Sequence, residues 1–194
     1  MDGAPERRYH HGMELAVVIS DLHCGSSVGL MPPFYDDVDD GPSLRANKVQ
    51  RWLWKCWLDF TESWLPEVVG DDPWVLVVNG DLIDGVHHHS TQVHPDETVH
   101  ARIACEVLAP FAELAEKRYV IRGTEVHVKN LETGIAASLQ AEPSEQGWCH
   151  DHLMLNVGGC RVSFQHHIGA SVRPWLGGYQ LLASLVEEQF RAAS

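Results

Sequence analysis

The chain has 194 residues, of which 44% are hydrophobic, and its formal net charge at pH 7 is −13. This length and composition suit a single globular domain over residues 1–194 with a hydrophobic core of its own. The acidic balance and the lack of any Lys/Arg block exclude a broad basic surface for nucleic acid, so a nucleic-acid substrate would have to be held locally, for example by metal ions.

The five cysteines form no C-x-x-C pair, so the sequence predicts neither a disulfide framework nor a thiolate zinc site. No apolar run reaches the roughly 18 to 20 residues that a membrane span needs. We therefore expect a cytoplasmic protein that does not bind membranes.

The first predicted element is a strand over residues 14–20, with the sequence ELAVVIS. Its apolar residues are continuous instead of alternating, which predicts burial on both faces. A loop rich in Gly, Pro and Asp follows. From Ser43, a favourable N-cap residue, apolar side chains recur at steps of three and four, which predicts an amphipathic helix that ends at Pro66.

The middle of the chain repeats this alternation of strand and helix. Residues 74–79 and 119–122 are apolar runs, broken by Gly80 and Gly123 respectively, and a helix over about residues 97–117 separates them. Three buried strands separated by helices predict an α/β fold with a parallel sheet.

The pattern changes in the last third of the chain. After a short helix predicted over residues 131–140, apolar residues alternate on either side of Gly158-Gly159, which predicts a hairpin and therefore a mixed sheet. A final apolar stripe predicts a helix over about residues 178–193. This helix is a candidate surface for a homodimer.

Polar side chains follow each predicted strand. In an open α/β sheet, ligands bind beyond the carboxyl ends of the strands, where loops from several strands converge. Carboxylates and imidazoles are concentrated at these positions: Asp21, His23, Asp81, Asp84, Glu125, His127, His166 and His167.

Taken in order, these residues resemble the motifs of the calcineurin-like metallophosphoesterases, which are D-x-H, G-D-x-x-D, G-N-H-D or G-N-H-E, a strand-end His, and G-H-x-H. Residues 21–23 match the first motif and residues 80–84 the second, while His166 fits the strand-end His, with His167 as the second choice. The third motif is replaced by G-T-E-V-H at residues 123–127, and no later G-H-x-H is present.

The resemblance covers residues 14–168 and implies a layered sandwich of mixed β-sheets flanked by helices, here without its last strands. It also implies a centre of two divalent ions, Mn²⁺, Fe or Zn²⁺, which suit imidazole and carboxylate ligands. Asp21 and His23 would bind one ion, Asp81 would bridge both, and Glu125 with His166 would bind the second.

Two such ions lower the pKa of a shared water molecule and bind the phosphate oxygens for in-line attack. The resemblance then gives His127 the role of protonating the leaving oxygen. In a second alignment, His127 itself binds a metal ion, and this alternative remains open.

Further residues are expected around the ions. Asp84 would brace a ligand histidine, and Thr124 stands where the family has a metal-binding Asn. Arg122 either assists the substrate or is an exposed strand-end residue, and His87 and His88 are either accessory ligands or loop residues. Cys24 is a weaker candidate for a nucleophile, because neighbours in sequence seldom form a spatial triad.

The implied activity is hydrolysis of phosphate mono- or diesters, with a phosphorylated small molecule or a nucleic acid as substrate. The missing G-H-x-H motif leaves two alternatives. One is a catalytically weak or inactive metal-binding module with a regulatory role. The other is a fragment that needs a partner chain or a C-terminal extension to complete the site.

Overall fold

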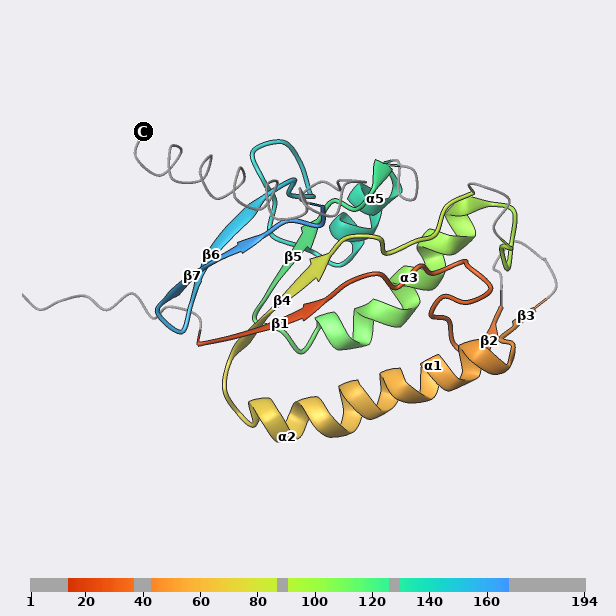
Figure 1. The fold of residues 1–194 in the computed structure, drawn as a ribbon, viewed down its shortest axis with the longest axis horizontal. Coiled ribbons are helices and arrows are strands. Elements are labelled where there is room, and N and C mark those ends of the chain that lie inside the picture. Colours follow the sequence, from red (N-terminus) through yellow and green to blue (C-terminus); the bar gives the residue numbers. More distant parts are fainter. Residues whose placement is uncertain (1–13, 37–42, 87–90, 126–129, 168–194) are drawn as a thin grey trace, which may run out of the picture.

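The computed structural model describes residues 14–36, 43–86, 91–125 and 130–167, so the predicted helix over 178–193, and any dimer through it, lies outside the described residues. Figure 1 shows the arrangement of the elements. The strands are β1 (Leu15–Ile19), β2 (Phe34–Tyr35), β3 (Leu44–Arg45), β4 (Trp74–Asn79), β5 (Lys117–Ile121), β6 (Leu153–Val157) and β7 (Cys160–Phe164). The helices are α1 (Lys48–Leu58), the π-helical segment η1 (Asp59–Trp64), α2 (Leu65–Val69), α3 (Glu97–Ala112) and α5 (Leu131–Ser138).

The central sheet has three parallel strands in the order β1-β4-β5. In its register, Val17 pairs with Leu76, and Val77 pairs with Tyr119. The predicted parallel sheet is therefore confirmed. Because the strands are parallel, their carboxyl ends lie at the same edge, and the loops that follow them meet there.

Strand β4 is buried on both faces because a different layer covers each one. Leu76 and Val78 belong to a large core with apolar side chains of the helices. Val75 and Val77, which alternate with them and so point to the other face, belong to a second core. The other buried members of that second core are Tyr119, Ile121, Leu153, Leu155 and Phe164.

The hairpin of β6 and β7 supplies the layer over this second core. It is an antiparallel pair that forms a sheet of its own, so the predicted mixed sheet is wrong for the described residues. Its alternating apolar residues give it one apolar face, and packing that face on β4 and β5 removes it from water. The result is an α/β fold with helices on one face of the parallel sheet and the hairpin on the other (Figure 1).

Strand β1 lies at the edge of the described part of the sheet, where it pairs with β4. The side chain of Val18 is 48% exposed, so the predicted burial on both faces is wrong. A continuous apolar run is typical of a strand covered on both faces, but it does not determine how completely an edge strand is covered.

Helix α1 has Asn47 as its N-cap, four residues after the predicted Ser43, because residues 44–45 form β3. The Asn47 side chain accepts hydrogen bonds from two backbone N–H groups of the first turn, and the Gln50 side chain accepts one from the Asn47 N–H at 3.1 Å. The Asn47 amide also donates to the carbonyl of Ser27 at 2.6 Å. The capping box therefore also attaches α1 to the loop after β1.

The helix does not end at Pro66, as predicted, but continues to Val69 in α2. Just before the proline, in η1, the N–H of Leu65 bonds to the carbonyl of Phe60, five residues back. This wider π turn relieves the contact that a proline ring otherwise makes with the preceding turn. The proline is thus accommodated within one helical rod.

The remaining helices differ little from their predictions. Helix α3 ends at Ala112, before the predicted residue 117, because the chain from Lys117 pairs as β5. Helix α5 covers most of the predicted residues 131–140. In the described ranges, no helix is long and apolar enough to cross a membrane.

Replacing Asn47 by Ala tests the cap. The substitution removes the hydrogen bonds to the first turn and to Ser27, so we expect the free energy of unfolding to fall by about 1–2 kcal/mol. Asn130→Ala is the matched control, because Asn130 is the N-cap of α5 but makes no side-chain cap hydrogen bond. It should change stability by less than about 0.5 kcal/mol. Urea denaturation followed by circular dichroism measures both, and equal losses would contradict the role of Asn47.

Candidate metal centre

The loops after β1 and β4 run side by side beyond the ends of the strands. The N–H of Asp21 donates to the carbonyl of Gly80 at 3.0 Å, and the N–H of His23 donates to the carbonyl of Asp81 at 3.0 Å. Asp21, His23 and Asp81 have left-handed backbone, with φ of 58°, 45° and 52°. Such a backbone costs an L residue about 1–2 kcal/mol. Strained residues of this kind cluster at functional sites, which favours a functional site at this edge of the sheet.

These same three residues form a possible metal-binding group. One potential ligand atom from each of Asp21, His23 and Asp81 lies within 4.8 Å of the other two. Asp21 is exposed, His23 is half-buried and Asp81 is buried. The group is therefore open to solvent on the side of Asp21 and anchored in the protein on the side of Asp81.

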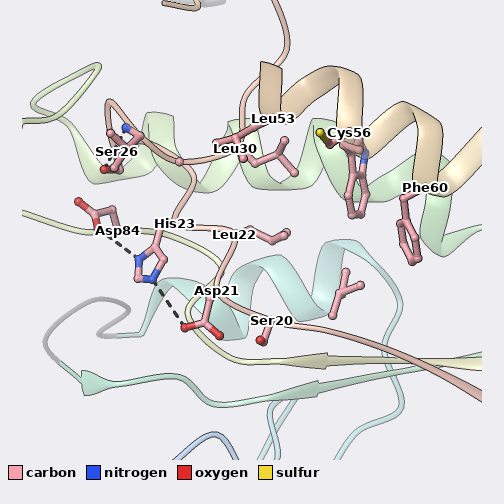
Figure 2. Close-up of a pocket in the computed structure, with 14 residues that line it drawn as sticks. Ser20, Asp21, Leu22, His23, Ser26, Leu30, Leu53, Cys56, Phe60 and Asp84 are labelled. Atoms are coloured by element: carbon pink, nitrogen blue, oxygen red, sulfur yellow. Dashed lines mark hydrogen bonds and ion pairs between the residues drawn. The ribbon is translucent and has the colours of Figure 1, made fainter. Parts of the chain in front are cut away.

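His23 is held between two carboxylates, as Figure 2 shows. Its Nδ1 lies 3.2 Å from Oδ1 of Asp84, and its Nε2 lies 3.7 Å from Oδ1 of Asp21. The other oxygen of Asp84 accepts a hydrogen bond from the Gln92 side chain at 2.7 Å. A carboxylate behind an imidazole fixes the orientation of the ring and raises its basicity as a ligand.

Asp81 is held by the loop after β5 and by the segment after β7. Its Oδ1 accepts the N–H of Thr124 at 2.7 Å, and its Oδ2 accepts the Thr124 hydroxyl at 3.3 Å. The same Oδ2 lies 3.1 Å from Nε2 of His166. One buried carboxylate thus joins segments that follow three different strands.

His166 is oriented by the backbone of β4. Its Nδ1 lies 2.6 Å from the carbonyl of Asn79, and because a carbonyl only accepts, Nδ1 carries the proton. Nε2 is therefore the nitrogen that faces Asp81. Burial alone would lower the pKa of His166, but the hydrogen bond to Asn79 and the charge of Asp81 raise it by more, so the pKa lies above its ordinary value. The surroundings of the ring therefore favour its protonated form.

Two glycines make this close packing possible. Gly80 has φ of 81°, and a Cβ added there would lie 2.5 Å from Cγ of the His166 ring. A Cβ on Gly123 would overlap the backbone N and the carboxylate of Asp81. Both glycines therefore allow the backbone to approach the side chains that surround Asp81.

Glu132 is a further residue of this region that the sequence interpretation missed. It is fully buried in the first turn of α5, where its Oε1 accepts the N–H of Leu82 at 3.0 Å and its Oε2 accepts the N–H of Gly123 at 2.7 Å. Burial raises the pKa of its carboxyl group. The sequence did contain a sign of its role. Glu132 shares a helical stripe with the apolar Ile135 and Ala136, and an acidic residue on an apolar stripe is unusual.

Several predicted site residues lie apart from the group or outside the described part of the chain. Glu125 is exposed and does not belong to the group of Asp21, His23 and Asp81, and His167 is exposed as well. The guanidinium of Arg122 is paired with Asp151 at 2.9 Å. The remaining three, which are His87, His88 and His127, lie outside the described residues.

Cys24 is unsuited to act as a nucleophile. Its side chain is fully buried, and burial raises the pKa of the thiol far above its ordinary value, which disfavours the reactive thiolate. The buried position of Cys24 therefore agrees with the sequence, which made it only a weak candidate for a nucleophile.

No protein-family model and no curated protein matches this chain. Residue chemistry and geometry therefore carry the functional interpretation. The donor set fits a divalent transition metal, because two carboxylates and an imidazole each place one oxygen or nitrogen within 4.8 Å of the others, and a second imidazole faces the buried carboxylate.

The candidate centre opens into a pocket of about 610 Å³ (Figure 2). Asp21, His23 and Asp84 line the pocket on the side of the strand-end loops. Apolar side chains of α1 and η1 line it on the other side, among them Leu53, Trp57 and Phe60. This volume is within the range of small-molecule sites, roughly 300–1,000 Å³.

Replacing Gly80 by Ala tests the contact between this glycine and His166. The added methyl group must displace the imidazole, so we expect Gly80→Ala to lower stability and to weaken binding of Mn²⁺. Gly159→Ala is the matched control, since Gly159 has φ of 79° and a Cβ there would meet no atom within 4 Å. The control should lose only the backbone cost of about 1–2 kcal/mol.

Urea denaturation and calorimetric titration with Mn²⁺ measure the two effects separately. Equal stability losses and unchanged Mn²⁺ affinity in both variants would show that the packing against His166 has no consequence for the centre.

Proposed function

We propose that this chain binds two divalent metal ions at the carboxyl ends of β1, β4 and β5 and hydrolyses phosphate mono- or diesters. The observation that carries the proposal is the convergence of Asp21, His23 and Asp81 within 4.8 Å. The resemblance of the sequence motifs to those of the metallophosphoesterases supports the same conclusion.

The predicted site residues that the structure brings together each have a role in this proposal. Asp21, His23 and Asp81 would hold the first ion, and Asp81 together with His166 would hold the second. Two observations support the bridging role: Asp81 belongs to the group of potential ligands, and its Oδ2 faces Nε2 of His166 at 3.1 Å. For Glu125, the role of ligand rests on the resemblance alone.

When bound, the two ions supply a water molecule of lowered pKa and charge that stabilises the phosphate oxygens. The chain's own residues prepare the site. Asp84 orients the imidazole of His23, and Thr124 holds the carboxylate of Asp81. The role of proton donor to the leaving oxygen goes to His127 by the resemblance.

Bound cations also reconcile an acidic protein with an anionic substrate. The formal net charge of −13 repels phosphate at long range. At the centre itself, divalent ions invert the sign of the local charge. The substrate is thus a phosphorylated small molecule or a nucleic acid that is held at the centre and not by a basic surface.

The five cysteines are all free, which suits a reducing compartment, and we therefore place the activity in the cytoplasm.

A metal-binding module without catalysis is the second candidate, since the sequence has no G-H-x-H motif after His166. The experiment below separates the two functions.

Replacing Asp81 by Asn removes the negative charge of the carboxylate while keeping the shape of the side chain. We expect Mn²⁺ affinity to fall by at least about 100-fold, and hydrolysis of p-nitrophenyl phosphate and bis(p-nitrophenyl) phosphate with added Mn²⁺ to fall to background. Asp71→Asn is the control, because Asp71 is exposed near the opposite end of β4. It should behave as the wild type.

Calorimetric titration and product absorbance provide the two measurements. Binding of Mn²⁺ by the wild type without hydrolysis of either ester would favour the non-catalytic module. If the wild type binds no Mn²⁺, or if Asp81→Asn equals the wild type in both measurements, the proposal fails.

A further inference from the structure

We propose that Glu132 is a positioning residue, which clamps the loops after β4 and β5 together and so sets the place of Asp81 in the metal centre. The role in metal binding rests on the function proposed above, whereas the clamp itself does not. Glu132 does not belong to the group of Asp21, His23 and Asp81, and it acts through the backbone of its neighbours.

Each oxygen of the Glu132 carboxylate accepts one backbone N–H group. Oε1 accepts the N–H of Leu82, in the loop after β4, at 3.0 Å, and Oε2 accepts the N–H of Gly123, in the loop after β5, at 2.7 Å. Both oxygens of one carboxylate are thus used, each by a different loop. A hydrogen bond to a charged group is shorter and stronger than one between neutral groups.

Both clamped residues are next to residues that form the centre. Leu82 directly follows Asp81, and Gly123 directly precedes Thr124. Thr124 in turn donates its N–H and its hydroxyl to the carboxylate of Asp81. Glu132 therefore fixes the backbone next to Asp81 relative to Thr124, the residue that donates to the Asp81 carboxylate.

A packing role alone does not account for this residue. Glu132 has 0% exposure, and burying a carboxylate costs far more than burying an apolar side chain unless hydrogen bonds compensate. Helix α5 has Ile135 and Ala136 for its apolar contacts with the core. The two backbone N–H groups explain why an acid occupies the buried stripe of this helix.

The clamp requires a carboxylate and not merely a polar side chain. Glutamine has nearly the same shape, but its amide has only one oxygen. Its NH₂ group would face the N–H of Leu82 or Gly123, so that two donors meet where a hydrogen bond was. Glu132→Gln therefore opens one side of the clamp and leaves the volume of the core unchanged.

The experiment compares Glu132→Gln with Ile135→Ala. The second variant weakens the packing of the same helix, one turn further on, because the side chain of Ile135 is 1% exposed. Mn²⁺ affinity is measured by calorimetric titration at a temperature at which all proteins are folded, and exchange of the amide protons of Leu82, Gly123 and Thr124 is measured by NMR.

We expect Glu132→Gln to weaken Mn²⁺ binding by about 10- to 100-fold, as the loss of an outer hydrogen-bond partner does at other metal sites. We also expect faster amide exchange at Gly123 or Leu82 and at Thr124. Ile135→Ala should lower the midpoint of unfolding but keep the Mn²⁺ affinity of the wild type. Should Glu132→Gln fail to fold, Glu132→Asp, which keeps the charge on a shorter side chain, provides a milder form of the same test.

Unchanged Mn²⁺ affinity in the Glu132 variant, or an equal loss in Ile135→Ala, would overturn the positioning role. Absence of Mn²⁺ binding by the wild type would instead contradict the proposed function. Amide exchange then still tests the clamp. The clamp is supported if exchange at Leu82, Gly123 and Thr124 is faster in Glu132→Gln than in Ile135→Ala, and it is contradicted if exchange is not faster.

Discussion

The buried carboxylate of Asp81 is the point on which the arrangement of the strand ends depends. Its oxygens accept two hydrogen bonds from Thr124 and face the imidazole of His166, while its backbone carbonyl accepts the N–H of His23. Segments that follow β1, β5 and β7 therefore all meet at one residue that follows β4. A buried carboxylate needs such partners, because an unpaired one would be too costly to keep in the interior.

The same edge of the sheet combines backbone strain with close approach. Asp21, His23 and Asp81 adopt left-handed backbone, and hydrogen bonds between the loops after β1 and β4 hold them there. Gly80 and Gly123 then let the imidazole and the carboxylate come close to the backbone. Strain of this kind persists only when the surroundings determine the conformation, and here the paired loops provide that constraint.

The electrostatics of the region explain why a cation suits it. The carboxylates of Asp21, Asp84 and Glu132 lie around Asp81, directly or through one intervening residue. The pKa of His166 is raised because the hydrogen bond to the Asn79 carbonyl and the charge of Asp81 together outweigh burial. The divalent ions proposed for this edge would balance the charge of its acidic side chains.

Local patterns in the sequence were sufficient to predict the strands at residues 74–79 and 119–122, the helix between them and the hairpin, because apolar periodicity and glycine breaks are properties of neighbouring residues. They also placed Asp21, His23 and Asp81 at strand ends. Only the tertiary structure decided that β1 lies at the edge of the described sheet, that the hairpin is a separate layer, and that Glu132 bonds two loops. Those features depend on which faces come into contact across long stretches of chain, and no local period encodes such contacts.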